Sequence, residues 1–461
     1  MVNWSGGGAE IRHSLNERYP YLNGNLGALV RATDDYFKPH VSWSAVSSGT
    51  PAFREYPEGL VFDAAANSIF PESESDRHTL AGILNSSVTT SLLEAIAPTM
   101  NFVVSDISKL PIVIPKASTL LTETVAALVE TSREDWDSFE TSWNFSTDSW
   151  PIEPGRLRDL AAEASEHWAL VAREQQDRET KVNQVVAEAY GLEGQVSIDV
   201  DMHKVSLARN IEFRYGPGKR PEEYDTLLLA DLASDLVSFA VGCLFGRYSL
   251  DKRGLILADP GATLRDYLEK VPKPTVMPDA DNVIPIVDGD WFEDDVVVRF
   301  RQFLRSAFGE QYFEENLEFV TDSLGVKNLQ DYFLKSFYKD HVQRYKKRPI
   351  YWLFSSPKGS FNALIYMHRY TPSTVSTVLT YLREYVTKLE SALQQAERAG
   401  NAKEADRLRK ILVELNEYEH DTLFPKASEN VVIDLDDGVK ANYPKFGAAL
   451  KKIPGLEATS D

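Results

Sequence analysis

Basic and aromatic side chains alternate in the stretch of this chain that is best suited to binding chemistry. Between Lys339 and Lys358, six lysines and arginines stand against a single acid, Asp340, and aromatic residues lie among them. Positive charge releases counterions from nucleic-acid phosphates. The alternative is a solvated hairpin edge whose lysines prevent pairing with another strand, and the sequence leaves both open. The candidate DNA-binding residues here are Arg344, Lys346, Lys347, Arg348 and Lys358.

Two short apolar runs lie within and just after this basic stretch. Residues 350–354 and 361–367 are strand-like, and Ser356-Pro357-Lys358-Gly359 between them has the composition of a turn. The sequence therefore predicts a β-hairpin next to the lysines and arginines.

No motif for catalysis or metal binding stands out. The chain has no Pro-Pro dipeptide, GxSxG, HExxH or phosphate-binding Walker loop, and its eight histidines are scattered. Pro278-Asp279 lacks the downstream partners of a nuclease motif. Residues 434–440 resemble the start of a calcium loop but lack its later ligands. We therefore predict no catalytic residue, metal site or cofactor site on this chain.

Composition and charge narrow the classes of protein. The 461 residues carry a formal net charge of −20, which argues mildly against nucleic-acid binding, although binding depends on the local field. One cysteine, Cys243, excludes an internal disulfide framework and suits the cytoplasm. Residues 236–245 form the most apolar short run, about half of what a bilayer requires. We expect a cytoplasmic protein without a membrane contact.

The first third of the chain reads as a small mixed domain. Residues 1–36 are turn-rich and predict a loop and an edge hairpin, in preference to a glycine-rich phosphate cradle. Residues 41–71 predict short strands with tight turns. Apolar residues at helical spacing predict a helix over 80–96 that Pro98 stops, followed by a strand over 102–107.

The remainder is mostly helical. Apolar spacing predicts helices over 116–133 and 157–190, the second ending at Gly191. Aromatic residues in 132–143 are interpreted as core residues in preference to a stacking platform. Residues 225–350 predict a helical block with a long loop at 272–290. Residues 375–419, broken at Gly400-Asn401, predict an antiparallel helical hairpin, which either packs on its own protein or serves as a spacer or docking rod.

Several segments resemble the PglX group, the adenine-specific DNA methyltransferases of BREX phage-defence systems. Residues 80–86 and 97–115 resemble its target-recognition region. Residues 36–44 resemble its "YF-PG-TWS" segment, with His40 where the group has glycine, and residues 54–63 match "R--P-G--FD". Further resemblance is carried by residues 4–11, 132–143, 241–248, 347–356 and 434–443, so that it extends over nearly the whole chain.

The resemblance implies a fold class, a division and a function. We expect an α+β protein with a mixed target-recognition domain at 1–115, a helical spacer at 116–230, a helical domain at 231–345, and the β-hairpin, helical hairpin and tail at 346–461. Residues 36–115 would face the DNA target. Their candidate contacts are Ser47, Ser48, Arg54, Asn85, Asn101 and Lys109. For Arg54 the alternative is a surface salt bridge.

An N6-adenine methyltransferase needs an Asn/Asp-Pro-Pro-Tyr/Phe motif, and this chain has no Pro-Pro dipeptide. The catalytic half of the family pattern is therefore not found. We therefore expect a specificity part, from a split gene or a truncated protein, that does not methylate alone. Its partners would be double-stranded DNA, other BREX proteins and a methyltransferase catalytic domain or subunit that binds S-adenosylmethionine. An interaction scaffold of the defence complex that does not read DNA is the alternative.

Overall fold

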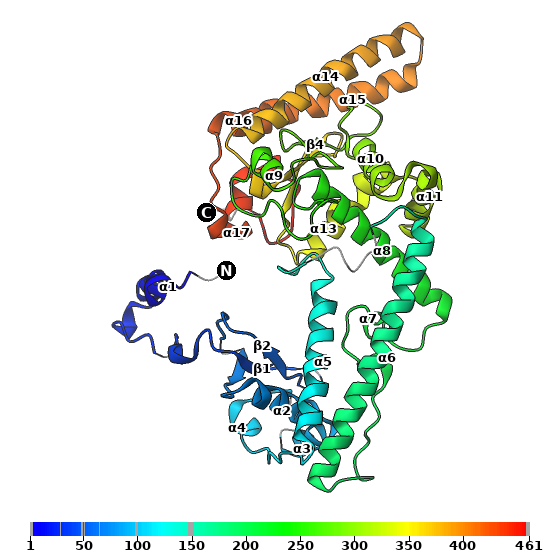
Figure 1. Cartoon of the computed structure of the whole chain (residues 1–461). Helices are drawn as coiled ribbons and strands as arrows, with labels where there is room; N and C mark the ends of the chain where they lie inside the picture. The colour runs from blue at the N-terminus through cyan, green and yellow to red at the C-terminus, as the bar shows by residue number, and fades with distance from the viewer. Residues whose placement is uncertain are drawn as a thin grey trace. The chain divides into compact units, whose positions relative to one another are not determined.

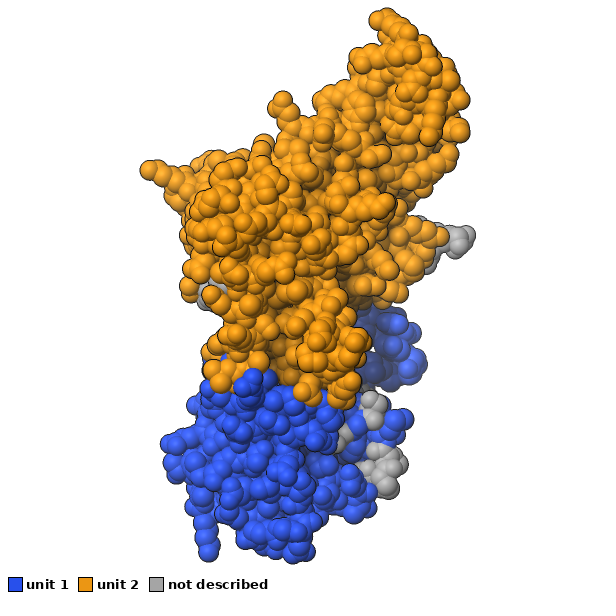
Figure 2. Space-filling model, turned by 90° about the vertical axis from the view of Figure 1, so that its right-hand side faces the viewer, with its two compact units in different colours: residues 1–133, 171–205 blue, residues 134–170, 206–461 orange. Residues whose placement is uncertain are grey.

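A computed structural model describes residues 3–27, 29–47, 49, 51–63, 65–96, 100–145 and 152–457. The chain forms two compact units, shown in Figure 2: unit 1 comprises residues 1–133 and 171–205, and unit 2 comprises residues 134–170 and 206–461. Two of the boundaries fall within helices α5 and α6, and the third lies between Val205 and Ser206. The boundaries of these two units differ from the domain boundaries expected at residues 115, 230 and 345. The expected four-part division stays a prediction.

Unit 1 contains one small sheet and several helices (Figure 1). Its elements are α1 (Ser5–Arg18), η1 (Pro20–Leu22), η2 (Thr33–Asp35), β1 (His40–Ser44), β2 (Arg54–Tyr56), β3 (Ala66–Ile69), α2 (Glu74–Asn85), α3 (Ser87–Ile96), α4 (Val104–Ile107), most of α5 (Ser118–Asp137), the second half of α6 (Leu157–Tyr190) and η4 (Met202–Lys204).

Unit 2 is mainly helical around a second small sheet. Its remaining elements are α7 (Ile211–Tyr215), α8 (Pro221–Leu244), α9 (Leu264–Lys270), β4 (Ile284–Pro285), α10 (Val296–Phe308), η5 (Glu310–Tyr312), α11 (Phe313–Ser323), α12 (Leu329–Tyr332), η6 (Phe333–Phe337), α13 (Tyr338–Arg344), β5 (Tyr351–Ser355), β6 (Asn362–Tyr366), η7 (Met367–Arg369), α14 (Thr374–Arg398), α15 (Ala402–Tyr418), η8 (Glu419–Leu423), α16 (Phe424–Glu429), η9 (Leu435–Asp437), α17 (Val439–Asn442) and η10 (Tyr443–Ala449). The α+β class is confirmed.

The sheet of unit 1 confirms the short strands predicted between residues 41 and 71. Strand β1 lies between β2 and β3, and both pairings are antiparallel. Val41 and Trp43 of β1 are buried in the core of this unit. The Trp43 indole donates a hydrogen bond of 2.8 Å to the Phe102 carbonyl, which fixes the segment after α3 beside the sheet.

Two local predictions in unit 1 are wrong. The single helix expected over residues 80–96 is two helices. Helix α2 begins earlier, with Ser73 as its N-cap, and it ends at Ser86, whose hydroxyl donates a hydrogen bond to the Ile83 carbonyl. The expected strand at 102–107 is instead one backbone hydrogen bond, from Phe102 N to Ala45 O, followed by the short helix α4. Pro98, the expected helix stop, lies outside the described residues.

The turn-rich N-terminal segment is partly helical, against the expected loop and edge hairpin. Helix α1 spans residues 5–18, but Gly6, Gly7 and Gly8 have positive φ values outside the right-handed helical region, so the regular helix follows them. At Gly8 a Cβ atom would lie 2.8 Å from the Trp4 ring, so a larger residue would displace that indole. The indole itself packs edge-on against Tyr36, with ring centroids 4.9 Å apart.

The centre of unit 2 is formed by α8 and the sheet of β4, β6 and β5. Strand β6 lies between the other two, and β5 and β6 are buried along their whole length. Such continuously apolar strands are typical of a sheet covered on both faces. The packing at Gly242 is close, because a Cβ atom there would collide with the Tyr248 ring. The neighbouring Cys243 is buried and unpaired.

Both predicted hairpins in unit 2 are confirmed. Strands β5 and β6 pair antiparallel, with Leu353 opposite Leu364. Helices α14 and α15 lie side by side, as Figure 1 shows, and their apolar faces are buried between them. The helix predicted at 157–190 is also confirmed, and it ends at Gly191, which has a φ of +67°.

Helix α8 has the length and apolar composition of a membrane-spanning helix, and 67% of its most apolar window is buried inside the protein. Residues from Leu236 to Leu244 are packed into the core of unit 2. This burial is typical of a central core helix in a globular unit.

The expected core aromatics of residues 132–143 are a further correction. Trp136 is 57% exposed and Trp143 is 74% exposed. Only Phe139 is partly covered, since the Arg209 guanidinium lies 4.0 Å from its ring centroid. Periodicity alone did not show which aromatic residues would find neighbours from distant segments.

Glu179, in the part of α6 that belongs to unit 1, provides a test of this packing. Burial raises the pKa of its carboxyl to about 7. An unfolded glutamate loses its proton near pH 4.3, so folding at neutral pH requires proton uptake and stability falls as the pH rises from about 4 to 7. We expect Glu179→Gln to raise the free energy of unfolding at pH 8 by up to about 3 kcal/mol and to leave it unchanged at pH 4.

Urea unfolding followed by circular dichroism at the two pH values measures this change. Glu163→Gln, an exposed position on the same helix, is the matched control. An equal effect of both substitutions at pH 8 would refute the burial explanation.

Candidate nucleic-acid interface

Three of the predicted basic residues of unit 2 follow one another in the turn after α13. We call Lys346, Lys347 and Arg348 the basic turn; all three are exposed. The Lys346 N–H donates to the Gln343 carbonyl at 2.9 Å, and the Lys347 N–H donates to the Val342 carbonyl at 2.8 Å. These two bonds close the helix end in a Schellman motif.

The backbone of the basic turn has an unusual conformation for its sequence. Lys346 and Lys347 have φ values of 49° and 60°, in the left-handed region where glycine normally stands. For a residue with a side chain this costs on the order of 1 kcal/mol. Two adjacent lysines in this conformation point to a role for the side chains, because unfavourable backbone geometry concentrates at functional sites.

His341 holds the chain on the far side of the basic turn. Its Nε2 atom accepts hydrogen bonds from the N–H groups of Ile350 (3.2 Å) and Tyr351 (3.0 Å). An accepting Nε2 requires a neutral ring, and burial, followed by the charges of Arg344 and Arg247, lowers the pKa of His341 well below its ordinary value. The turn is therefore fixed at both ends.

The aromatic residues expected beside the basic turn are not available for stacking. Tyr351 and Trp352 are completely buried. The Trp352 indole donates to the Pro349 carbonyl at 3.1 Å, so its only polar atom is used within the protein. The Tyr351 and Trp352 rings therefore belong to the protein core. The exposed side chains of the basic turn are all charged.

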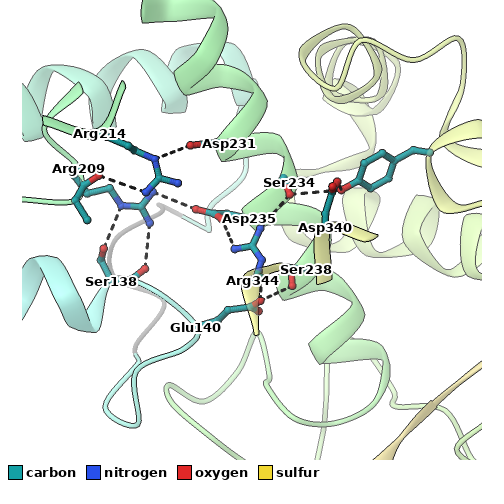
Figure 3. A network of polar contacts seen from close by, with 12 residues as sticks. Ser138, Glu140, Arg209, Arg214, Asp231, Ser234, Asp235, Ser238, Asp340 and Arg344 are labelled. Carbon is teal, nitrogen blue, oxygen red and sulfur yellow. Dashed lines mark hydrogen bonds and ion pairs between the residues drawn. The ribbon is translucent and has the colours of Figure 1, made fainter. Parts of the chain in front are cut away.

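Arg344, which the sequence placed with the surface cations, points into the protein (Figure 3). Its guanidinium is paired with both Asp235 and Glu140, the latter at 3.2 Å. Its Nη2 also donates to the Ser234 hydroxyl at 3.0 Å. Arg344 is therefore already engaged, and its contact with DNA stays a prediction that this geometry does not favour.

The two carboxylates respond differently to burial. Burial raises the pKa of Glu140, although Arg344 and the Ser238 hydroxyl, which donates at 2.6 Å, oppose it. Burial also acts on Asp235, but Arg344 and then Arg209 outweigh it and hold the pKa of Asp235 below its ordinary value. Asp235 is consequently the charged centre of the network.

Arg209 extends this network to a neighbouring loop, as Figure 3 shows. Its Nη1 lies 3.2 Å from the Asp235 carboxylate. Its guanidinium also lies over the rings of Phe139 and Trp168, at 4.0 and 4.7 Å from their centroids. Cation–π contacts of this kind are strongest when the cation is shielded from water.

Lys358 lies on the turn of the β-hairpin. The Glu414 carboxylate of α15 accepts hydrogen bonds from the Lys358 N–H (2.7 Å) and the Ser356 hydroxyl (2.6 Å). The backbone of this turn is thereby tied to the helical hairpin, while the Lys358 side chain is exposed.

The candidate residues of unit 1 lie in several settings. Arg54 is exposed on β2. The Asn85 side chain bonds to both the N–H and the carbonyl of Phe53, so its amide holds the chain and is not free for a base edge. Lys109 pairs with Asp106 at 2.9 Å.

The other candidates of unit 1 stand around one short backbone pairing. Ser47 accepts a bond from Gly49 N and donates its own N–H to Met100 O, and Asn101 forms a bridge with Val46. Ser48 lies outside the described residues. The candidates thus fall into two groups, one in each unit.

Sequence reasoning missed the acids that hold Arg344. Asp235 stands within the apolar part of α8, and charged residues in such positions are rarely buried without a partner. That position was the available signal. Among the residues that the structure describes, no group of three or more His, Cys, Asp or Glu side chains is placed to hold a metal ion.

Two known proteins align with nearly the whole chain, whereas no protein-family model matches it. The adenine-specific methyltransferase BrxX of Escherichia coli O9:H4 (strain HS) is 30% identical over 483 residues, covering 99% of this chain and 39% of the relative. The adenine-specific methyltransferase PglX of Lacticaseibacillus casei (strain Zhang) is 31% identical over 500 residues, covering 99% and 38%. The chain is homologous to these methyltransferases and spans about two-fifths of their length.

The network around Arg344 predicts that substitutions of two neighbouring cations, Arg344 and Lys347, differ clearly in their effect on stability. Arg344→Gln leaves Asp235 and Glu140 without their shared cation, and removal of one partner from a buried ion pair costs about 3–5 kcal/mol. We expect a loss of this order in the free energy of unfolding, measured in urea. Lys347→Gln, three residues away and exposed, is the control and should change stability by less than about 0.5 kcal/mol. Similar losses in both variants would contradict the assignment.

Proposed function

We propose, from the homology to BrxX and PglX, that this chain is the DNA target-recognition part of a PglX-like N6-adenine methyltransferase of a BREX phage-defence system. Methyl transfer then belongs to a catalytic part, outside this chain, that binds S-adenosylmethionine. The proposal is supported by alignment over 99% of the chain with adenine-specific methyltransferases.

The basic turn is the observation that carries DNA binding. Three exposed cations stand in a row at a helix end whose backbone is held by hydrogen bonds on both sides. Side chains on such a fixed turn lose little backbone freedom on meeting phosphates, so the favourable release of counterions is offset less. Phosphate contacts of this type position the duplex and carry no sequence information.

Base reading is assigned to unit 1. Its polar candidates lie on β2 and on the paired segments near Ser47 and Asn101, beside a small rigid sheet. Each good contact of a side chain with a base edge is worth about 1–3 kcal/mol of discrimination. The catalytic partner flips the target adenine out of the duplex.

An interaction scaffold that does not read DNA is the second candidate. The net charge of −20 favours it, since a protein of that charge repels nucleic acid unless a local basic surface compensates. Titration of a labelled duplex at several salt concentrations distinguishes the two, because phosphate binding weakens steeply with salt. The absence of salt-dependent binding would leave the scaffold.

A titration of labelled S-adenosylmethionine tests where the chemistry resides. The proposal expects no saturable binding to this chain, and measurable binding would contradict it.

Because the backbone of Lys346 and Lys347 is left-handed, glycine can replace both residues and remove their charges without destabilising the fold. In Lys346→Gly/Lys347→Gly both charges are removed and the backbone strain is relieved, so the fold should be as stable as before or slightly more so. We expect weaker duplex binding and a slope of log affinity against log salt that is smaller by about 2. Fluorescence anisotropy at several salt concentrations measures both quantities.

Two matched controls separate charge from backbone. Asn430→Gly relieves a φ of 50° at the end of α16 without removing a charge. Lys410→Gln removes an exposed charge on α15. Either control reproducing the full loss of DNA binding would show that the basic turn is not the contact.

A further inference from the structure

A large open groove in unit 2 has a chemistry opposite to that of the basic turn. Its volume is about 1430 Å³, and it is bounded by the loops at 275–281 and 291–294 and by the exposed sides of α10 and α14. Hydroxyl-bearing residues of α14, including Ser376 and Thr380, and Ser373 just before the helix line one wall. Trp291 and Phe292 contribute apolar surface.

Carboxylates outnumber cations in this groove. The two cations each have a partner already: Arg299 pairs with Asp279 at 3.4 Å, and Lys388 pairs with Glu384 at 2.7 Å. The groove-lining acids Asp281, Glu293 and Asp294 pair with no lysine or arginine in the part of the chain that the structure describes. The groove therefore has three carboxylates outside any ion pair, one of which, Asp281, also interacts with the charge of Arg369.

Two of these carboxylates, those of Asp281 and Asp294, act on the same side chain, Tyr381 of α14. The Tyr381 hydroxyl of α14 donates to the Asp294 carboxylate. Burial and this bond, followed by the charges of Asp281, Asp294 and Asp279, raise the pKa of Tyr381 above its ordinary value. Asp279 responds in the same way, since burial and then the charge of Asp281 raise its pKa to about 6. A bound cation would relieve this repulsion.

Lys388 shows how a cation is accommodated here. Its ammonium lies 4.4 Å from the centroid of the Phe292 ring, 2.7 Å from Glu384 and within hydrogen-bond distance of the Trp291 carbonyl. The groove thus combines carboxylates, a backbone acceptor and an aromatic face around one lysine side chain. This is the combination that desolvated ammonium and guanidinium groups favour.

Other classes of occupant fit less well. The groove carboxylates that form no ion pair repel nucleic-acid phosphates. The described residues offer no cluster of three metal-binding side chains. An uncharged apolar segment would leave the carboxylates desolvated without partners, which is costly.

We propose that this groove binds an extended cationic segment of a partner protein, whose lysine or arginine side chains pair with Asp281, Glu293 and Asp294. The site is independent of the basic turn and of the proposed DNA binding. It gives unit 2 a protein-docking surface that a duplex cannot occupy.

The test uses the full chain and a fluorescein-labelled peptide of about ten residues that alternates lysine and serine. Its affinity is measured by anisotropy, beside a peptide with glutamine in place of lysine. The groove variant is Asp281→Asn/Glu293→Gln/Asp294→Asn. The control variant, Glu318→Gln/Asp322→Asn/Glu417→Gln, removes the same charge from exposed positions of unit 2 outside the groove.

We expect the lysine peptide to bind, the glutamine peptide to bind at least about tenfold more weakly, and the groove variant to lose about tenfold in affinity. The control variant should lose less than about twofold, and duplex binding should be unchanged in the groove variant. Equal losses in the two variants, equal binding of the two peptides, or no binding of the lysine peptide to the parent chain would each overturn the proposal. A thermal unfolding scan confirms that the groove variant is folded.

Discussion

The arrangement of unit 2 depends on the placement of one guanidinium between two carboxylates. Arg344 is removed from most of its water, and such a charge is tolerated only where opposite charges and hydrogen bonds replace that hydration. Asp235 from α8 and Glu140 from the segment after α5 supply them. Because Arg344 is the last residue of α13, this pairing also sets the position from which the basic turn leaves the helix.

The net charge of this molecule does not describe its local surfaces. The net charge of −20 conceals a row of three exposed cations at residues 346–348 and a groove in which acids are in excess. Exposed charges more than about 8 Å apart are largely screened from one another at physiological salt, so the local charges decide what each surface attracts. A single chain of this kind can therefore present one surface to phosphates and another to a polypeptide.

Patterns with a regular period were predictable from the sequence, and contacts that depend on distant segments were not. The hairpin of β5 and β6, the paired helices α14 and α15 and the end of α6 at Gly191 follow from local apolar spacing and turn residues. At residues 102–107 the local preference for strand was wrong, since Phe102 makes one hydrogen bond to Ala45 and the chain then turns into α4. The sequence located the basic turn but not the burial of Arg344, because the identity of its acidic partners is a property of the folded chain.

The burial of Cys243 has a practical consequence. The only thiol of the protein is enclosed at the end of α8, where burial raises its pKa well above the ordinary value, so the reactive thiolate is scarce. Maleimide or iodoacetamide reagents should therefore bypass the native residue in the folded protein. A cysteine introduced at any chosen surface position would carry a fluorophore or spin label without background, and no cysteine-free parent would have to be engineered first.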